Sequence, residues 1–293
     1  MKVTVLTPTY NRGYIIDKCF ESLCNQTCKE FEWIIVDDGS TDNTKDVIRN
    51  FSKKAPFKIR YIYKENGGKH TALNKGIKEV STELTFIVDS DDRLTEDAIY
   101  TISNEWEKIK DNKKLCGINF LRGYSYDKVI GTKFPKDHYI DNGIDIQFRH
   151  NVRGDKAEVW RTDLLKKYKF PVFENEKFLG ENIVWWKIAL EYDMFYINKI
   201  IYITEYLEGG LSKSGRKLRI KCPLGGMENS KAGMGKKFPL KERIKRTTLY
   251  ICYGFFANKK ILWMINDCGQ PALFIISLPL GYLLKTYWKY KYN

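Results

Sequence analysis

The first hundred residues alternate short apolar runs with longer segments whose apolar residues recur every three or four positions. The short runs are rich in β-branched and aromatic residues, and they predict strands at 3–7, 31–37, 58–63 and 84–89. The segments between them have the spacing of amphipathic helices. A series of alternating strands and helices folds into a mostly parallel sheet with helices on both faces, so we expect an α/β fold.

Polar segments follow each of the four predicted strands. In such a sheet, ligands bind beyond the carboxyl ends of the strands, so we expect the four segments to converge on one crevice. They are Thr7 to Arg12 (TPTYNR), Asp37 to Ser40 (DDGS), Asn66 to Lys69 (NGGK) and Asp89 to Asp92 (DSDD).

The fourth segment places Asp89, Asp91 and Asp92 together, with only Ser90 among them. Like charges oppose one another's ionisation, so such a cluster requires a positive partner or water. Hard divalent cations such as Mg²⁺ or Mn²⁺ take oxygen ligands and share them with substrate phosphates. The alternative is that Asp92 or Thr95 caps a following helix. A cap needs only one carboxylate, which favours the metal.

The second and third segments also have both a structural and a ligand-binding interpretation. The turn after Asp38 is a good helix start without either preceding aspartate, which leaves Asp37 and Asp38 able to accept hydrogen bonds from a base or ribose. Two glycines and Lys69 stand directly before a predicted helix, where backbone N–H groups and a cation can meet phosphate. Most Gly-Gly pairs, however, are plain turns.

Together, TPTYNR, VDDGSTDNT, the pattern NxGxxxAxNxG and DSDD resemble, in this order, the amino-terminal half of family 2 glycosyltransferases with the GT-A fold. The resemblance covers residues 1–110 and extends, through 153–160 and 178–193, to about 210. It implies an inverting, metal-dependent enzyme that moves a sugar from a nucleoside diphosphate sugar, with UDP favoured, to a hydroxyl of a glycan or lipid-linked acceptor. Cell-surface polysaccharide synthesis is the implied setting.

The resemblance also implies roles for particular residues. The nucleobase of the donor would lie between Pro8 and Tyr10 and donate a hydrogen bond to Asp38, with Asp37 beside Asp38. The ribose and diphosphate would lie near Asn66, Gly68 and Lys69. Asp89 and Asp91 would form the DxD pair, one toward the ribose and one on Mn²⁺ or Mg²⁺. Ser90 between them would also belong to the residues that bind the nucleotide sugar. Asp92 rivals them for the metal, and the order of the aspartates stays open.

Family members often have an acidic pair at the start of a helix below the acceptor, and one of the two carboxylates is the general base. The matching residues here are Glu181 and Asn182, so only Glu181 can act, with Asp155 in reserve. The alternative is a catalytically idle glutamate in a first helical turn. Trp185 and Trp186 either offer a face to an acceptor sugar or belong to the core.

The net charge of +14 is concentrated at the carboxyl end, because residues 209–293 contain 17 Lys and Arg against three Asp and Glu. We expect a catalytic domain at 1–208, with halves 1–110 and 111–208, and a basic extension at 209–293 that opens with a Gly- and Lys-rich loop to 239. The apolar run 271–284 is shorter than the about 20 residues that span a bilayer. With the aromatic and lysine residues after it, it predicts an anchor on an anionic membrane surface, or else a buried helix.

The start of the chain lacks the pattern of a signal peptide, so we expect a cytoplasmic protein, peripheral on the inner face of the cell membrane. A nucleotidyltransferase would carry a Gly-rich basic signature after the first strand, and TPTYNRG fits that poorly. A nucleic-acid partner is not expected, because the excess charge avoids the ordered domain and no nucleic-acid-binding motif appears. A catalytically inactive sugar-nucleotide binder stays open if Glu181 is not the base.

Overall fold

The computed structural model describes the backbone of residues 1–205 and 211–292, and the side chains of all of these except 211–214. It contains two compact units. The first is Met1–Lys169 with Glu191–Tyr206, and the second is Phe170–Leu190 with Leu207–Asn293. This division differs at 170–190 from the one expected from the sequence. The expected boundary at 208 lies outside the described residues.

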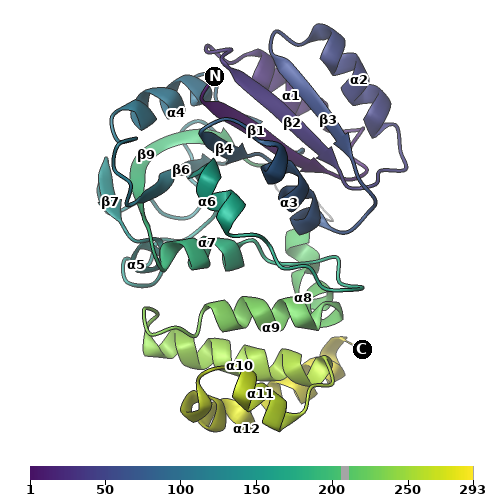
Figure 1. Cartoon of the computed structure of the whole chain (residues 1–293), viewed down its shortest axis with the longest axis vertical. Helices are drawn as coiled ribbons and strands as arrows, with labels where there is room; N and C mark the ends of the chain where they lie inside the picture. Colours follow the sequence, from purple (N-terminus) through teal and green to yellow (C-terminus); the bar gives the residue numbers. More distant parts are fainter. Residues whose placement is uncertain (206–210, 293) are drawn as a thin grey trace. The chain divides into compact units, whose positions relative to one another are not determined.

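The first unit is built on a sheet that has nine strands in the described residues, in the order β3-β2-β1-β4-β8-β6-β9-β5, with β7 paired to β9 (Figure 1). The strands are β1 (Val3–Thr9), β2 (Phe31–Asp37), β3 (Lys58–Tyr63), β4 (Leu84–Ile87), β5 (Arg93–Leu94), β6 (Leu115–Gly123), β7 (Tyr139–Asp141), β8 (Lys156–Arg161) and β9 (Asp193–Ile203). The first four are mutually parallel, so their carboxyl ends lie at one edge of the sheet.

Helices cover both faces of this sheet. They are α1 (Asp17–Cys24), α2 (Thr44–Lys54), α3 (Lys69–Glu79), α4 (Ala98–Glu107), α5 (Gly143–Phe148) and α6 (Thr162–Lys167). On one face, Trp33 lies beside Phe20 of α1 and Phe51 of α2, with ring centroids 6.3 Å away in both cases. On the other face, α3 approaches so closely that a Cβ on Gly76 would lie 2.3 Å from Leu6. The expected α/β fold with helices on both faces is therefore confirmed.

The later strands are more mixed than the first four. β8 lies between β4 and β6 and is antiparallel to both, whereas β6 and β9 are parallel. The short strand β5 directly follows the acidic segment and pairs with the end of β9, with Leu94 opposite Tyr202. The sheet order therefore brings strands from the second half of the unit to the acidic segment.

The second unit is helical in its described residues. Its helices are α7 (Asn182–Ala189), α8 (Leu211–Lys221), α9 (Pro223–Ala232), α10 (Leu240–Phe256), α11 (Ile261–Asp267) and α12 (Pro271–Tyr292). The prediction of a Gly- and Lys-rich loop at 209–239 is wrong for 211–232, and residues 209 and 210 lie outside the described residues. Gly226 is in α9 for close packing, because a Cβ there would lie 2.7 Å from the Tyr253 ring. Pro223 occupies the first position of α9, where proline is well tolerated.

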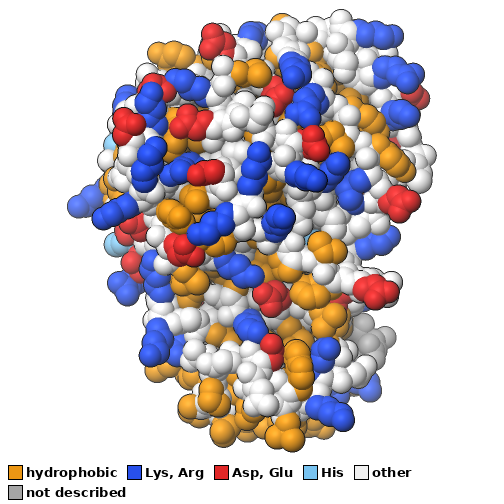
Figure 2. Space-filling model, in the orientation of Figure 1, with side chains coloured by type: hydrophobic (Ala, Val, Ile, Leu, Met, Phe, Trp, Pro, Cys, Tyr) orange, Lys and Arg blue, Asp and Glu red, His pale blue; other side chains and the backbone are white. Residues whose placement is uncertain are grey.

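Helix α12 has a buried stripe and an exposed apolar face. Gly281 packs on Ile251 of α10, and Trp288 packs on Tyr253 with ring centroids 5.6 Å apart. The opposite face exposes large apolar side chains, and hydrophobic atoms gather over α11 and α12 (Figure 2). None of the helices in the described residues has both the length and the apolar content needed to cross a membrane.

Candidate functional site

The carboxyl ends of β1 and β2 are tied together by their loops. Thr9 pairs with Asp37 in the parallel register, and the Asp38 N–H donates to the Thr9 carbonyl at 2.8 Å. Asn11, in the left-handed conformation with φ 51°, donates its N–H to Ser40 Oγ at 2.8 Å. The segments TPTYNR and DDGS therefore lie side by side, as the strand order predicts.

Asp38 organises the loop that precedes α3. Its carboxylate accepts from Lys64 Nζ at 2.6 Å, from the N–H groups of Gly67 and Gly68 at 3.0 and 2.7 Å, and from Asn66 Nδ2 at 3.2 Å. Gly68 has a φ of 94°, which a residue with a Cβ rarely adopts. The third segment is thus held against the second by one buried carboxylate. A contact between Asp38 and a nucleobase stays a prediction.

The other residues expected around a base differ in accessibility. Asp37 is buried and accepts from Tyr61 Oη at 2.7 Å and from the Ser40 N–H at 2.8 Å. Pro8 is buried within β1, whereas the Tyr10 side chain, just beyond the end of β1, is 47% exposed. Tyr10 therefore offers an open aromatic face at this edge of the sheet, while Asp37 supports the turn after β2.

Each of the three carboxylates in the acidic segment lies beside its own basic side chain. Lys69 Nζ is 2.6 Å from Asp89, Arg12 Nη2 is 3.8 Å from Asp91, and Arg122 Nη1 is 3.8 Å from Asp92. The crowding of like charge in the sequence is therefore compensated by cations that come from three different parts of the chain.

The environments of these carboxylates differ. Burial raises the pKa of Asp89, but Lys69 and Arg122 outweigh it and hold that pKa below its ordinary value. For Asp92, burial and the Asp89 charge raise the pKa to about 7. Asp92 accepts from Tyr202 Oη at 2.8 Å, and α4 has Asp97 as its N-cap residue. The alternative interpretation, in which Asp92 or Thr95 caps this helix, is therefore wrong.

The acidic segment fits a metal site that is shared with a substrate. Among the residues that the structure describes, no three His, Cys, Asp or Glu side chains are placed to hold a metal on their own. Mg²⁺ is usually held by one or two carboxylates together with substrate phosphates. Asp89 and Asp91 have side chains 30% and 24% exposed, so they can supply that part of the ligand set, with Asp91 the more weakly paired.

Sequence reasoning missed four residues that shape this region: Arg12, Lys64, Arg122 and Tyr202. Arg12 is the last residue of the TPTYNR segment, so its nearness to the crevice could have been inferred. Lys64 directly follows β3, another position that the strand-end rule covers. Arg122 and Tyr202 come from β6 and β9, and only the sheet order brings them to the acidic segment.

The segment with the predicted base lies in the second unit. Glu181 is half-buried directly before α7, and the neighbouring Asn182 Oδ1 accepts from Asn229 Nδ2 of α9 at 2.8 Å. Upstream, the buried Glu176 accepts from the N–H groups of Leu224 and Gly225, both at 2.7 Å. Helix α9 therefore fixes the segment on either side of Glu181.

The remaining predicted residues are accounted for within their own units. Asp155 is exposed in the first unit, between Gly154 and the buried Lys156. Trp186 is buried in the second unit, where the Arg246 guanidinium lies 4.4 Å from its ring centroid. This position agrees with the core interpretation for Trp186. Trp185 is half-buried and packs edge-on against Phe170.

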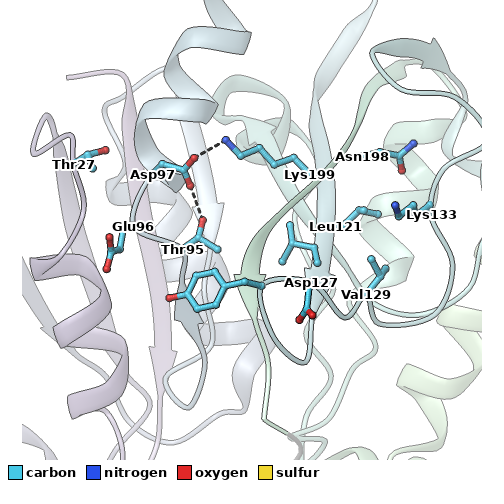
Figure 3. A pocket seen from close by; sticks show the side chains of 12 residues that line it. Thr27, Thr95, Glu96, Asp97, Leu121, Asp127, Val129, Lys133, Asn198 and Lys199 are labelled. Atoms are coloured by element: carbon cyan, nitrogen blue, oxygen red, sulfur yellow. Dashed lines mark hydrogen bonds and ion pairs between the residues drawn. The ribbon is translucent and has the colours of Figure 1, made fainter.

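A separate cavity of about 710 Å³ opens in the first unit and contains none of the predicted site residues. Its lining comes from Thr27, the segment before α4, β6 with the loop that follows it, and β9 (Figure 3). There Asp97 accepts from Thr95 Oγ1 at 3.0 Å and lies 2.5 Å from Lys199 Nζ. These polar groups are paired with one another, so the cavity adds nothing to the assignment of the crevice.

Residues 4–154 match the sequence model of glycosyl transferase family 2. The chain belongs to this family. GlyA, a glycosyltransferase of Streptococcus pneumoniae, is 30% identical over 224 residues, which are 72% of this chain and 32% of GlyA. The GalNAc(5)-diNAcBac-PP-undecaprenol beta-1,3-glucosyltransferase of Campylobacter jejuni is 28% identical over 207 residues, 69% of this chain and 64% of that enzyme. The chain thus spans less than two thirds of either relative.

Solved structures show the same fold as this family 2 chain. S. aureus TarS 1-349 in complex with UDP superposes with a TM-score of 0.64 at 17% identity, over 99% of this chain and 92% of that one. The mannosyltransferase PcManGT from Pyrobaculum calidifontis, in complex with GDP-Man and Mn²⁺, gives 0.58 at 18% identity, over 100% and 81%. The expected membership of family 2 and the fold are both confirmed.

Proposed function

We propose that this chain transfers a sugar from a nucleoside diphosphate sugar, with UDP as the nucleotide, to a hydroxyl of a glycan or lipid-linked acceptor. The transfer inverts the configuration at the anomeric carbon. One observation carries the proposal: a partly exposed acidic segment and basic side chains meet at the carboxyl ends of four parallel strands. Ligands of parallel sheets bind at that edge. Family membership and the UDP complex of a protein with this fold support the same conclusion.

In this proposal, Arg12 and Lys69 stabilise the negative charge of the leaving diphosphate. When the glycosidic bond of the donor breaks, negative charge builds on the leaving diphosphate and must be stabilised. Arg12 and Lys69 lie beside Asp91 and Asp89, so both cations are already at the acidic segment before any donor binds. A divalent ion held by Asp91 and Asp89 would supply further positive charge next to the diphosphate. Asp92 is not needed for this, because it is buried and paired internally.

We assign the proton transfer to Glu181. The acceptor hydroxyl must lose a proton as it attacks, and Asn182 cannot accept one. Glu181 precedes α7 in a segment that α9 holds on both sides, so its backbone is well fixed within the second unit. Asp155 is the second candidate, since it is an exposed carboxylate.

Binding of donor nucleotides tests the proposal. Purified protein is heated with UDP, GDP, ADP and their sugar conjugates, with and without Mn²⁺, and the melting temperature is recorded. We expect UDP compounds to raise the melting temperature and Mn²⁺ to increase the effect, because a ligand that binds only the folded state stabilises it. Asp91→Asn should lose the Mn²⁺-dependent part. If no nucleotide shifts the melting temperature of the wild type, the proposed function is wrong.

We also propose that α11 and α12 attach the protein to an anionic membrane surface on the cytoplasmic side. Ile276 and Leu283 lie on one face of α12 and are 64% and 63% exposed, and Leu262 of α11 is 78% exposed. In these two helices the described residues carry one carboxylate, Asp267, and it is paired with Lys231 at 2.8 Å. Apolar side chains flanked by lysines suit the headgroup region of anionic lipid.

Co-sedimentation with vesicles tests this attachment. We expect wild-type protein to sediment with vesicles of phosphatidylglycerol and phosphatidylcholine, and the double variant Ile276→Gln, Leu283→Gln to remain in solution. Both residues are exposed, so the fold should survive. Val172→Gln is the matched control, because Val172 is 61% exposed in the same unit but outside α11 and α12. Equal sedimentation of the double variant and the control would rule out this surface.

A further inference from the structure

The acidic segment is held from inside the first unit by Tyr202 of β9. Tyr202 is fully buried, and its hydroxyl accepts from the Asp89 N–H at 2.9 Å while donating to Asp92 Oδ2 at 2.8 Å. One hydroxyl therefore joins the two ends of the four-residue turn Asp89 to Asp92. Because a hydroxyl both donates and accepts, no other buried side chain of this shape could make both bonds at once.

Arg122 of β6 fixes the tyrosine in turn. Its guanidinium carbon lies 4.0 Å from the centroid of the Tyr202 ring, and its Nε donates to the Lys156 carbonyl at 2.6 Å. Phe86 packs edge-on against the ring, with centroids 6.0 Å apart. The ring thus has a cation above it and an aromatic edge beside it, which leaves the hydroxyl little freedom.

The backbone after the turn is tied to the same strand. Arg93 and Leu94 of β5 pair with Ile203 and Tyr202 of β9 in antiparallel register. The turn therefore starts at a hydrogen bond to the Tyr202 hydroxyl and ends at a backbone pairing with the Tyr202 residue itself. Its two ends cannot shift independently of β9.

The aspartates of this turn differ in burial and direction. Asp92 is 4% exposed and points inward to Tyr202 and Arg122, whereas Asp89 and Asp91 keep side chains 30% and 24% exposed. A buried carboxylate without donors is costly, so Asp92 and its partners form one interdependent group. The inward anchoring of Asp92 leaves the other two carboxylates at the open edge.

We propose that Tyr202 is a positioning residue of the donor site, whose hydroxyl sets the direction of Asp89 and Asp91 by anchoring Asp92. The inference rests on the proposed function, because it assumes that Asp89 and Asp91 meet the donor. Tyr202 itself does not touch the donor. Arg122 acts through the tyrosine ring, and Asp92 is an anchor and not a direct ligand of the cation or the diphosphate.

The variant Tyr202→Phe tests the inference, because it removes one oxygen and keeps the ring under Arg122. We expect the affinity for UDP in the presence of Mn²⁺ to fall about 10- to 100-fold, the usual effect of losing a residue that orients metal ligands. The Mn²⁺ concentration that gives half-maximal stabilisation by UDP should rise as well. Tyr196→Phe is the matched control on the same buried strand, and its nucleotide affinity should equal that of the wild type.

Two further measurements keep the test decisive if Tyr202→Phe is less stable. Hydrogen exchange at the Asp89 amide, without nucleotide, should be slow in the wild type and faster in Tyr202→Phe relative to the amides of β1. In addition, Asp92→Asn should weaken UDP binding less than Asp91→Asn does, because the amide oxygen can still accept from Tyr202.

The outcomes separate the two ideas. If wild-type protein binds UDP and Tyr202→Phe binds it equally well, the positioning role is overturned and the proposed function stands. If Asp92→Asn weakens binding more than Asp91→Asn, Asp92 is a direct ligand and the inference is again overturned. If the wild type binds no nucleotide, the proposed function fails and the inference falls with it.

Discussion

At the residue scale, the proposed general base Glu181 is followed by an amide, Asn182, and not by a second carboxylate. The side-chain oxygen of Asn182 accepts a hydrogen bond from Asn229. Its role here is to hold the segment in place. Under the proposed function, the proton of the acceptor hydroxyl would then pass to Glu181 or to a carboxylate elsewhere.

The variant Glu181→Gln should therefore lose sugar transfer and keep donor binding. General base catalysis typically contributes about 10²- to 10⁴-fold in rate, so we expect a loss in that range. Transfer is measured by release of UDP with a suitable acceptor, and donor binding by thermal shift. Asn182→Asp is the control, since an aspartate can still accept from Asn229. Undiminished turnover in Glu181→Gln would move the base to Asp155, which Asp155→Asn then tests.

Lys156 gives a prediction about pH. It is buried, its ammonium donates to the carbonyls of Arg153 and Gly154 at 2.6 and 3.1 Å, and burial lowers its pKa to about 8. The folded state releases this proton near pH 8 and the unfolded state near the ordinary value of 10.5. Between these values the unfolded state binds more protons, so the free energy of unfolding should rise with pH.

Denaturant unfolding of the wild type and of Lys156→Met, at intervals between about pH 7.5 and about pH 10, measures this effect. The difference between the two proteins isolates Lys156 from the other groups that titrate there. We expect the wild type to gain relative to the variant as the pH rises, by up to about 3 kcal/mol. Parallel curves for the two proteins would show that Lys156 has an ordinary pKa.

The sequence could predict part of the site at this scale. Asp38, Lys69 and Asp89 follow predicted parallel strands, and geometry alone requires such positions to meet at one edge. The nearness of Arg122 and Tyr202 to the acidic segment could not be predicted. It depends on the positions of β8 and β9 in the sheet, and local sequence patterns do not reveal the order of strands in a sheet. The pairing of each aspartate with its own cation was also beyond the sequence, since it depends on side-chain distances.

At the scale of elements, the region 209–239 shows why composition can mislead. Glycine and lysine together indicate a loop when only the local chain is considered. In α9, however, Gly226 allows the helix to approach the Tyr253 ring, a contact with a residue 27 positions later in the sequence. Strong strand and helix periodicities in the first hundred residues carry no such ambiguity, and there the expected elements are confirmed.

The two variants Gly226→Ala and Gly235→Ala measure this packing. A Cβ on Gly226 would lie 2.7 Å from the Tyr253 ring, whereas a Cβ on Gly235 would meet no atom within 4 Å. Overpacking typically costs about 1–3 kcal/mol, so Gly226→Ala should lower the melting temperature although alanine favours helices. Gly235→Ala should change it little. Equal melting temperatures for the two variants would mean that α9 and α10 do not pack this closely.

At the scale of the whole molecule, charge divides the chain into a nearly balanced part and a strongly basic part. Residues 209–293 hold 17 Lys and Arg against three Asp and Glu, whereas the rest of the chain is nearly balanced. If the basic part meets anionic lipid, its exposed charges should be screened by salt, with a Debye length of about 10 Å at 0.1 M. Vesicle binding should therefore weaken as NaCl is raised, and a salt-independent interaction would point to apolar contact alone.

The central claim is that the acidic segment at the end of β4 receives the diphosphate of a sugar donor. A structure of the protein with UDP-sugar and Mn²⁺ tests it most directly. We predict the metal on Asp91 or Asp89, with the diphosphate beside Arg12 and Lys69, and Asp92 still bonded to Tyr202. A complex that places the diphosphate away from residues 89–92, with the Lys69–Asp89 and Arg12–Asp91 pairs undisturbed, would contradict the account.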